Sequence, residues 1–381
     1  MRLLHTSDWH LGRSLISVPL IDEQRFFLHW LVDQVRAHEV DAVLISGDVY
    51  DRAVPSVEAI ALLEWALVQL SKTASIVLIP GNHDSPTRLG FAGPLLEAAR
   101  VHMRADVGDL ERPVVLTGKH GEQCAVYCIP FLEPTLQAER LQSERTHEAV
   151  LSAAMTLIRS AHTAEMPMVV LSHAFITGGF SSDSERDVRV GGIPDAPIAL
   201  FEGASYVALG HLHRPQQVGA DSGVIARYAG SPLAYSFSEE GQQKSVTLID
   251  LEPSGDSTIE LLATPQPRPL TTIRGELAEL LSSGQYEGVE QHWIRAILTD
   301  PRRPENPMDR LRQRFPHALQ LEFAPDGLVP GQLPSTTPIS LQDPAAVTCQ
   351  FIEYVTGTQP SAQEVTLIQD AVSRVRTGLV D

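Results

Sequence analysis

The chain has 381 residues, of which 43% are hydrophobic and 20% are charged, and its formal net charge at pH 7 is −18. This length predicts two domains or one large domain with an appendage, and the composition excludes a disordered or fibrous protein. The negative charge would repel a polyanion over most of the surface. A nucleic-acid substrate would therefore need positive charge supplied locally by bound metals, a partner or a confined basic patch.

The cellular setting follows from the cysteines and from the first residues. Cys124, Cys128 and Cys349 form neither a CxxC pair nor an even framework, which is typical of a reducing compartment. Asp8 and His10 interrupt the apolar segment that a signal peptide would need, and no apolar run approaches the length of a membrane-spanning helix. We therefore expect a cytoplasmic protein.

Short apolar runs alternate with amphipathic stretches over the first 250 residues. Five runs, bounded by glycine or polar residues, are predicted as buried strands: 2–4, 41–48, 75–84, 168–174 and 206–213. The stretches 56–72 and 147–162 are predicted as helices, and the runs 227–238 and 244–252 as hairpin strands that complete a mixed sheet. This alternation predicts a layered α/β core.

The pattern changes at TPQPRP (264–269), which is predicted as a linker. A small β-α-β-α-β arrangement is predicted between residues 270 and 325, followed by a loose stretch at 326–338. Two helices are predicted within 342–376, and the second begins at Ser361 with Glu364 three residues later, which is a capping-box pattern. The predicted domains are therefore 1–263, 270–326 and 340–381.

Each of the five predicted core strands ends in side chains that can bind a metal or transfer a proton. These residues are Asp8, His10, Asp48, Asp51, Asn82, His83, Asp84, His173, His211 and His213. Residues two apart in an extended chain face the same way, as at Asp8 and His10. Any one of them alone is more often a capping, turn or surface residue. Sites in α/β sheets form beyond the carboxyl ends of the strands, so five such ends together favour one shared site.

Seven of these residues can serve as metal ligands: Asp8, His10, Asp48, Asn82, His173, His211 and His213. One metal with four ligands would leave three unused, whereas two metals that share a carboxylate use all seven, and Asp48 is the natural bridge. No cysteine takes part, so a pair of Mn, Fe, Mg or Zn ions fits. Such a pair suits in-line attack of water on phosphorus.

The residues next to these ligands suit proton transfer. His83 follows Asn82 directly, so in an extended chain its ring points away from the metals. It could donate a proton to the leaving oxygen, with Asp51 or Asp84 orienting the ring.

The motifs DxH, GDxxD, GNHD, a lone His and GHxH, in this order, resemble the calcineurin-type metallophosphoesterase superfamily. The stretches HTSDWHLGR, GDVYDRAVPS, TGGFSSDSERDVRVGG and RYAGSPLAYSFSE, the last followed by KSV, further resemble the SbcD family of nuclease subunits. The resemblance covers essentially the whole chain. It implies an α/β four-layer metallophosphoesterase fold with mixed central sheets (1–263), a small α/β cap domain (270–326) and C-terminal helices that bind a partner (340–381).

The resemblance also implies roles for the site residues. One metal would be held by Asp8, His10, Asp48 and His213, and the other by Asp48, Asn82, His173 and His211. Manganese is the family's usual metal. His83 would be the catalytic histidine, and Asp51, where some relatives have a His, would orient it as in the phosphatases.

The resemblance further implies two protein partners. A homodimer would form through helices after the second and third motifs, for which residues 56–72 fit, although a helix sandwiched between sheet and loops fits equally well. An SbcC-type coiled-coil ATPase would bind the C-terminal helices, whose alternative is to fold back onto the cap domain.

The resemblance, added to the ligand set, implies a manganese-dependent DNA nuclease that acts in repair, recombination and replication. It would be an exonuclease on duplex ends and an endonuclease on hairpins or single strands. Arg13, Arg52 and Arg88 lie just past the metal motifs and are candidate DNA phosphate contacts, although exposed arginines are more often simply solvated. The alternative is a small-molecule phosphodiesterase or phosphoprotein phosphatase of the same superfamily.

Overall fold

The structure, a computed structural model, describes residues 1–163, 165–185, 196–325, 343–356 and 358–377. It divides into two compact units, residues 1–271 and 272–381, and each unit is described by itself. The predicted loose stretch 326–338 lies outside the described residues.

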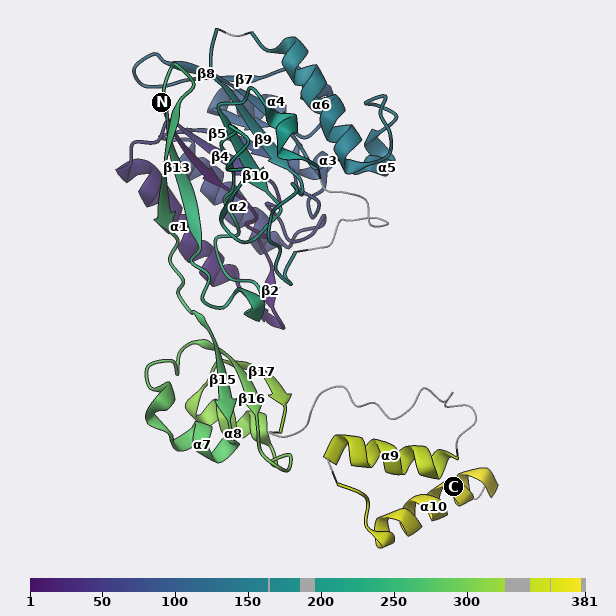
Figure 1. The fold of residues 1–381 in the computed structure, drawn as a ribbon. Coiled ribbons are helices and arrows are strands. Elements are labelled where there is room, and N and C mark those ends of the chain that lie inside the picture. Colours follow the sequence, from purple (N-terminus) through teal and green to yellow (C-terminus); the bar gives the residue numbers. More distant parts are fainter. Residues whose placement is uncertain (164, 186–195, 326–342, 357, 378–381) are drawn as a thin grey trace. The chain divides into compact units, whose positions relative to one another are not determined.

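Two six-stranded sheets form the centre of the first unit (Figure 1). The first sheet contains, in spatial order, β14 (Ser257–Ala263), β13 (Ser245–Leu251), β1 (Arg2–Thr6), β4 (Ala42–Ser46), β5 (Ser75–Ile79) and β6 (Val101–Met103). The second contains β11 (Gln216–Val218), β12 (Ala226–Tyr228), β10 (Tyr206–Gly210), β9 (Met168–His173), β8 (Gln123–Ile129) and β7 (Val114–Thr117). Both sheets mix parallel and antiparallel pairs.

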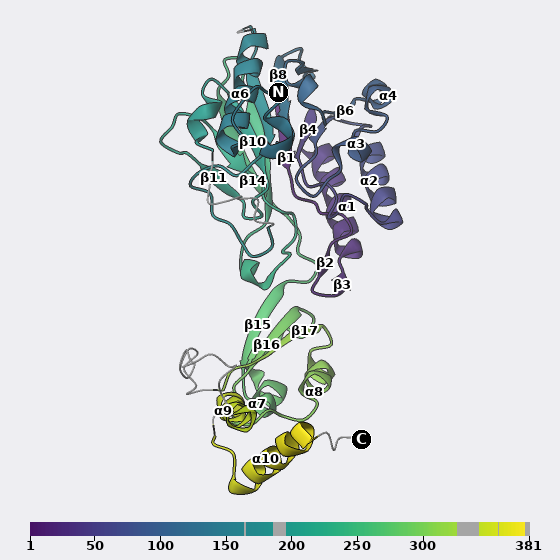
Figure 2. The ribbon, with the colours of Figure 1, turned by 90° about the vertical axis from the view of Figure 1, so that its right-hand side faces the viewer.

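Helices cover the outer face of each sheet, so the first unit has four layers (Figure 2). The helices α1 (Ile21–Ala37) and α2 (Val57–Leu70) pack on the first sheet, and α6 (His147–Ala161) packs on the second. Between the sheets lies a third cluster of apolar side chains that includes Leu44 and Leu171. The predicted α/β four-layer fold with mixed sheets is confirmed.

The predicted helices begin at the residues that their capping chemistry favours. Ser56 Oγ accepts from the Ala59 amide at 3.2 Å at the start of α2, and Thr146 Oγ1 accepts from the Ala149 amide at 3.1 Å at the start of α6. The smaller elements of this unit are β2 (Ser14–Leu15), β3 (Val18–Pro19), α3 (Pro86–Leu89), α4 (Gly93–Leu96) and α5 (Pro134–Gln137).

The five predicted core strands are present, but they divide between the two sheets as β1, β4 and β5 in one and β9 and β10 in the other. The run 244–252 is confirmed as β13, which forms a hairpin with β14. Only the start of the hairpin strand predicted over 227–238 is present: β12 pairs antiparallel with β11 and parallel with β10, and it ends at Tyr228, so the predicted strand over the rest of the run is wrong. The chain leaves the sheet there because Gly230 has a φ of 78° and Pro232 has no amide proton for a ladder.

The second unit contains the predicted β-α-β-α-β order (Figure 1). Its elements are β15 (Leu270–Gly275), α7 (Leu277–Ser282), β16 (Trp293–Leu298), α8 (Pro307–Arg314) and β17 (Ala318–Phe323), and the sheet order is β15-β16-β17. The two predicted final helices are α9 (Pro344–Thr356) and α10 (Ala362–Thr377). The capping box is present, because the Ser361 amide donates to Glu364 Oε2 at 2.8 Å and the Glu364 amide donates to Ser361 Oγ at 3.3 Å.

Among the residues that the structure describes, no helix is both long and apolar enough to cross a membrane.

Candidate metal centre

The carboxyl ends of five strands from both sheets meet at one place in the first unit. β1, β4 and β5 run parallel in the first sheet, and β9 and β10 run parallel in the second. Ser46, at the end of β4, joins the sheets there. Its Oγ donates to the Ala208 carbonyl at 3.0 Å, and its own carbonyl accepts from His173 Nδ1 at 2.8 Å. The loops after these strands therefore share one site, although they belong to two sheets.

The predicted metal ligands are mostly buried. Six of them are at most 4% exposed: Asp8, His10, Asp48, His173, His211 and His213. Asn82 is half-buried. Burying so many ionisable groups together costs free energy unless they are paired or bind an ion.

The backbone is strained where these ligands lie. Asp8, His10, Asp48 and His211 have φ values of 53°, 45°, 48° and 108°, in a region that residues other than glycine rarely adopt. The neighbouring Gly210 cannot carry a side chain, because a Cβ there would lie 1.8 Å from the Ser46 carbonyl oxygen. Strain of this kind persists where the surrounding structure enforces it, and it gathers at functional sites.

Three of the ligands form one group. Asp8, His10 and His213 each offer a ligand atom, and these atoms all lie within 4.8 Å of one another. Nε2 of His10 faces Nε2 of His213 at 3.0 Å. The main-chain amide of His211 donates to both carboxylate oxygens of Asp8, at 3.0 and 3.2 Å, which fixes the direction of that carboxylate.

The remaining ligands surround Asp48 and Asn82. Oδ2 of Asp48 lies 3.6 Å from Nε2 of His10 and 3.6 Å from Nε2 of His173, so this carboxylate stands between the two groups. Oδ1 of Asn82 lies 3.0 Å from Nε2 of His173 and 3.2 Å from Nδ1 of His211. The structure thus brings all seven predicted ligands together.

The electrostatics of the cluster favour a bound cation. Burial raises the pKa of the Asp8 carboxyl well above its ordinary value, and the nearby Asp48 carboxylate adds to this rise. Burial also lowers the pKa of the imidazoles of His10, His173 and His211. Neutral imidazoles present lone pairs to a metal, and a cation would offset the repulsion between the carboxylates.

The direction of the lone pairs on His173 and Asn82 also favours a bound cation. Nδ1 of His173 faces the Ser46 carbonyl, which can only accept, so the proton of the neutral ring lies on Nδ1. Its Nε2 lone pair then faces Asn82 Oδ1, another acceptor, at 3.0 Å. Two acceptors at this distance repel each other unless a cation binds both. The oxygen and nitrogen donors at this site fit divalent ions such as Mn²⁺, Fe²⁺ or Zn²⁺.

The proposed proton donor, His83, is held by main-chain atoms. Its amide donates to Asp48 Oδ1 at 2.9 Å, and its Nδ1 lies 2.8 Å from the main-chain carbonyl of Asp51. The Asp51 carboxylate instead lies 3.6 Å from Nδ1 of His10 and 3.5 Å from Nη1 of Arg13. Asp84 accepts from the amides of Val49, Tyr50 and Gly81, so it braces the loops that carry Asp48 and Asn82. Whether the Asp51 side chain orients His83 stays a prediction.

The three predicted phosphate contacts differ in their surroundings. The side chain of Arg52 is 83% exposed, with Nε 3.6 Å from Asp51 Oδ2. Arg88 is exposed and donates to the Ala53 carbonyl at 2.7 Å. Arg13 is largely buried, donates to the Ser184 carbonyl at 2.6 Å and lies over the ring of Tyr235. Arg52 and Arg88 are therefore accessible to a ligand, whereas Arg13 is engaged within the fold.

Several residues that support the ligands were not singled out from the sequence. Ser46 holds the His173 ring, and Gln24 donates to the main-chain carbonyl of His10 at 2.7 Å. Ser184, Glu185 and Lys244 bond to His213. Ser184, Glu185 and Lys244 fall in stretches that carry the family resemblance, but no spacing rule relates them to His213, because the contacts join segments about 30 residues apart.

The candidate metal centre lies in the part of the chain that matches a known family model. Residues 1–215 match the model described as calcineurin-like phosphoesterase, a family that uses divalent metal ions, and residues 266–355 match the type 5 capsule protein repressor C-terminal domain. A dimetal phosphatase from Danio rerio covers 70% of this chain and 97% of its own at a TM-score of 0.42 and 13% identity.

Curated relatives match over most of their length. The chain is 34% identical over 318 residues to the D subunit of the nuclease SbcCD from Escherichia coli K12, covering 78% of each protein. The same protein of Escherichia coli O157:H7 matches with equal identity and coverage. The chain therefore belongs to the calcineurin-like phosphoesterases and, among them, to the family of SbcD nuclease subunits, which makes it a metal-dependent phosphodiester hydrolase.

Proposed function

We propose that this protein is a manganese-dependent DNA nuclease, an exonuclease on duplex ends and an endonuclease on hairpins or single strands. The observation that carries the proposal is the convergence of seven oxygen and nitrogen ligands, from five strand ends, in a chain whose curated relatives are nuclease subunits. Oxygen and imidazole donors without thiolate suit Mn²⁺.

In this proposal the ligands divide between two ions. Asp8, His10, Asp48 and His213 would hold one ion, and Asp48, Asn82, His173 and His211 would hold the other. Two bound ions supply Lewis acidity, which polarises a phosphodiester and lowers the pKa of an attacking water. Support comes from Asp48 Oδ2, which lies equally far from a histidine of each set.

His83 is proposed as the residue that protonates the leaving oxygen. Its Nδ1 faces the Asp51 carbonyl at 2.8 Å, so a protonated ring keeps Nδ1–H on that carbonyl and leaves Nε2–H for the substrate. The main-chain amide of His83 donates a hydrogen bond to Asp48 Oδ1, which links the His83 main chain to the proposed bridging ligand. Arg52 and Arg88 would contact DNA phosphates beside it. Arg13 was predicted for the same role, and its contacts with Ser184 and Asp51 favour a supporting one.

We propose two protein partners for the chain. The curated relatives are named as subunits of SbcCD, which supports an SbcC-type coiled-coil ATPase as the first partner. Residues 340–381 are its proposed docking segment, because Phe351, Val355, Leu367 and Val375 of α9 and α10 are 48–69% exposed. Exposed apolar residues along a pair of short helices suit recognition in a groove.

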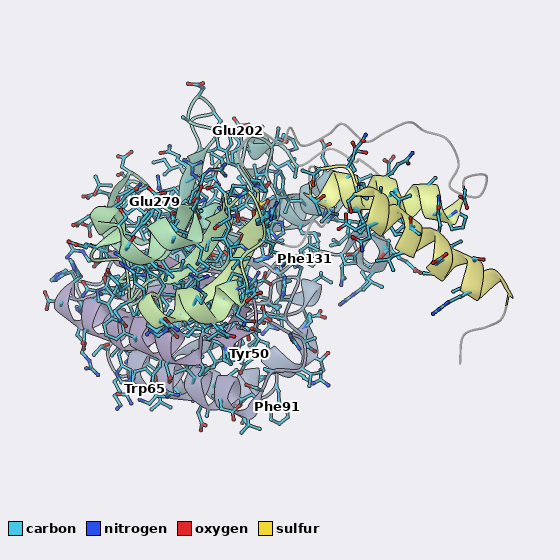
Figure 3. The ribbon with its side chains drawn as sticks, turned by 90° about the horizontal axis from the view of Figure 1, so that it is seen from below. Tyr50, Trp65, Phe91, Phe131, Glu202 and Glu279 are labelled. Carbon is cyan, nitrogen blue, oxygen red and sulfur yellow. The ribbon has the colours of Figure 1, made fainter. Side chains whose placement is uncertain are left out.

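The second proposed partner is another copy of this chain. On α2 the apolar residues Val57, Ile60 and Val68 are 78%, 47% and 50% exposed, although Leu62 and Leu63 on the same helix are buried in the core. Phe91, before α4, is 80% exposed, and Figure 3 shows Trp65 and Phe91 at the periphery of the first unit. An apolar patch of this kind supports a homodimer.

The test is a comparison of substrates with purified protein and Mn²⁺. Fluorescent duplex, hairpin and single-stranded DNA would be assayed beside p-nitrophenyl phosphate and bis-p-nitrophenyl phosphate, with EDTA as the control. We expect cleavage of DNA and of the diester. Hydrolysis of p-nitrophenyl phosphate without cleavage of DNA would instead favour the phosphatase alternative. A duplex with blocked ends, with and without the ATPase, separates the exonuclease and endonuclease activities.

A further inference from the structure

His213 is held from three sides by residues that are not metal ligands. We propose that Ser184, Glu185, Glu239 and Lys244, together called the His213 clamp, are positioning residues that set the metal affinity of the position formed by Asp8, His10 and His213. The inference rests on the proposed two-metal function and adds a separate control over one of the two positions.

The first part of the clamp fixes the ring of His213. Ser184 Oγ bonds to Nδ1 of His213, and Ser184 Oγ lies 2.9 Å from Ser182 Oγ. Ser182 Oγ in turn donates to Glu185 Oε2 at 2.8 Å. A carboxylate can only accept, so the hydroxyl protons along this chain point toward Glu185. Ser184 must then accept from Nδ1–H of His213.

This direction of bonding decides which nitrogen is free. With the proton on Nδ1, the lone pair of the neutral ring lies on Nε2, which faces Nε2 of His10 at 3.0 Å. A hydrogen bond to the second ring nitrogen fixes tautomer and orientation in histidine ligands of metals, and it raises their basicity. The clamp therefore presents His213 in its ligating form.

The second part of the clamp fixes the main chain of His213. Glu185 Oε1 accepts from the His213 amide at 2.6 Å, and Lys244 Nζ donates to the His213 carbonyl at 2.8 Å. Lys244 pairs with Glu239, both are at most 1% exposed, and Glu239 Oε1 lies 3.9 Å from His213 Nδ1. A buried ion pair is costly unless further hydrogen bonds satisfy its remaining donors and acceptors. The bond from Lys244 to the His213 carbonyl is one of these, so the ion pair helps to fix the main chain of His213.

The other metal position is held differently. The His173 ring bonds to the main-chain carbonyl of Ser46 at the end of β4, and both groups belong to strands. Ser184 and Glu185 of the clamp instead lie in a loop after β9, and Arg13 links this loop to the His10 motif by donating to the Ser184 carbonyl at 2.6 Å. Loosening the loop should therefore lower the metal affinity of the position that contains His213 and leave that of the position that contains His173 unchanged.

The test is calorimetric titration of metal-free, full-length protein with Mn²⁺, together with thermal melting of the metal-free state. We expect two ions for the wild type. For Ser184→Ala we expect one ion at wild-type affinity, the other weakened by about 10–100-fold, and a metal-free melting temperature lower by no more than the few degrees that the lost hydrogen bonds account for. Ser184→Thr keeps the hydroxyl and should restore binding. Ser181→Ala, the same change at an exposed residue of the same segment, is the matched control.

Glu185→Gln tests the direction of the relay with little change in shape. It keeps an acceptor for the His213 amide but removes the carboxylate that orders the hydroxyls, so the same position should weaken. Wild-type affinity at both positions in Ser184→Ala would overturn the clamp, as would an equal loss at both. Fewer than two ions in the wild type would overturn the two-metal proposal itself, and the clamp with it.

Discussion

Replacing Asp48 by alanine should remove both metals without unfolding the protein. The carboxylate is 2% exposed, and its Oδ2 lies 3.6 Å from a histidine of each proposed ligand set. In the metal-free state the variant loses the bond from the His83 amide to Oδ1, worth about 1 kcal/mol. Burial and, after it, repulsion by Asp48 raise the pKa of Asp8, and the variant relieves the repulsion. These effects oppose each other, so the metal-free melting temperature should change by no more than a few degrees.

The metal-loaded state should differ far more. An ion at one hundred times its Kd stabilises the folded protein by about 2.7 kcal/mol. For a unit of this size that corresponds to about 5–10 °C in Tm for each ion. Addition of Mn²⁺ should therefore raise the Tm of the wild type by at least this amount and leave Asp48→Ala almost unchanged.

Calorimetric melting with and without Mn²⁺, and elemental analysis of the dialysed protein, measure these quantities. Asp48→Asn is the matched variant, since its amide oxygen can still accept from His83 while the charge is gone. The reasoning is refuted if Asp48→Ala retains two ions, because no residue that bridges both positions can be removed without loss at each.

Three further changes test other parts of the argument. His83→Leu should keep both ions and lose turnover by about 10²–10⁴-fold, and loss of metal from it would make His83 a ligand. Deleting residues 340–381 should leave Mn²⁺-dependent cleavage of short single strands intact and abolish co-purification with the ATPase. Precipitation of the truncated protein would mean that these helices belong to the chain's own core. Burial lowers the pKa of His5 from 6.5 to about 3, so below pH 6.5 the unfolded state takes up a proton that the folded state does not. The stability advantage of the wild type over His5→Gln should thus fall as the pH drops from 6.5 to 5, with a slope that approaches about 1.4 kcal/mol per pH unit near pH 5, which urea unfolding measures. A difference that does not vary with pH would contradict the shift.

The local chemistry of the chain was enough to predict most elements and the members of the site. Apolar runs that end in Asp, Asn or His predicted β1, β4, β5, β9 and β10 together with the proposed ligands that follow them, because strand ends and side-chain types are local properties. The caps at Ser56, Thr146 and Ser361 also depend on residues only three apart. The strand predicted over 227–238 stops at Tyr228 because contacts with another segment determine the path beyond it. The Ser231 amide donates to the His213 carbonyl at 3.1 Å, and a Cβ on Gly230 would lie 2.7 Å from Pro215.

Packing between distant segments settled what the motifs left open. The division of five strands between two sheets depends on which apolar faces bury each other, and no local pattern encodes that choice. The partners of two functional residues also follow no local pattern. His83 is held by the main-chain carbonyl of Asp51, and Arg13 bonds to Ser184, which lies 171 residues further along the chain. A hydrogen-bond partner is determined by the geometry of the folded chain. The sequence motifs therefore predict which residues are the candidate ligands, whereas the residues that orient them are brought into contact only when the two sheets pack together.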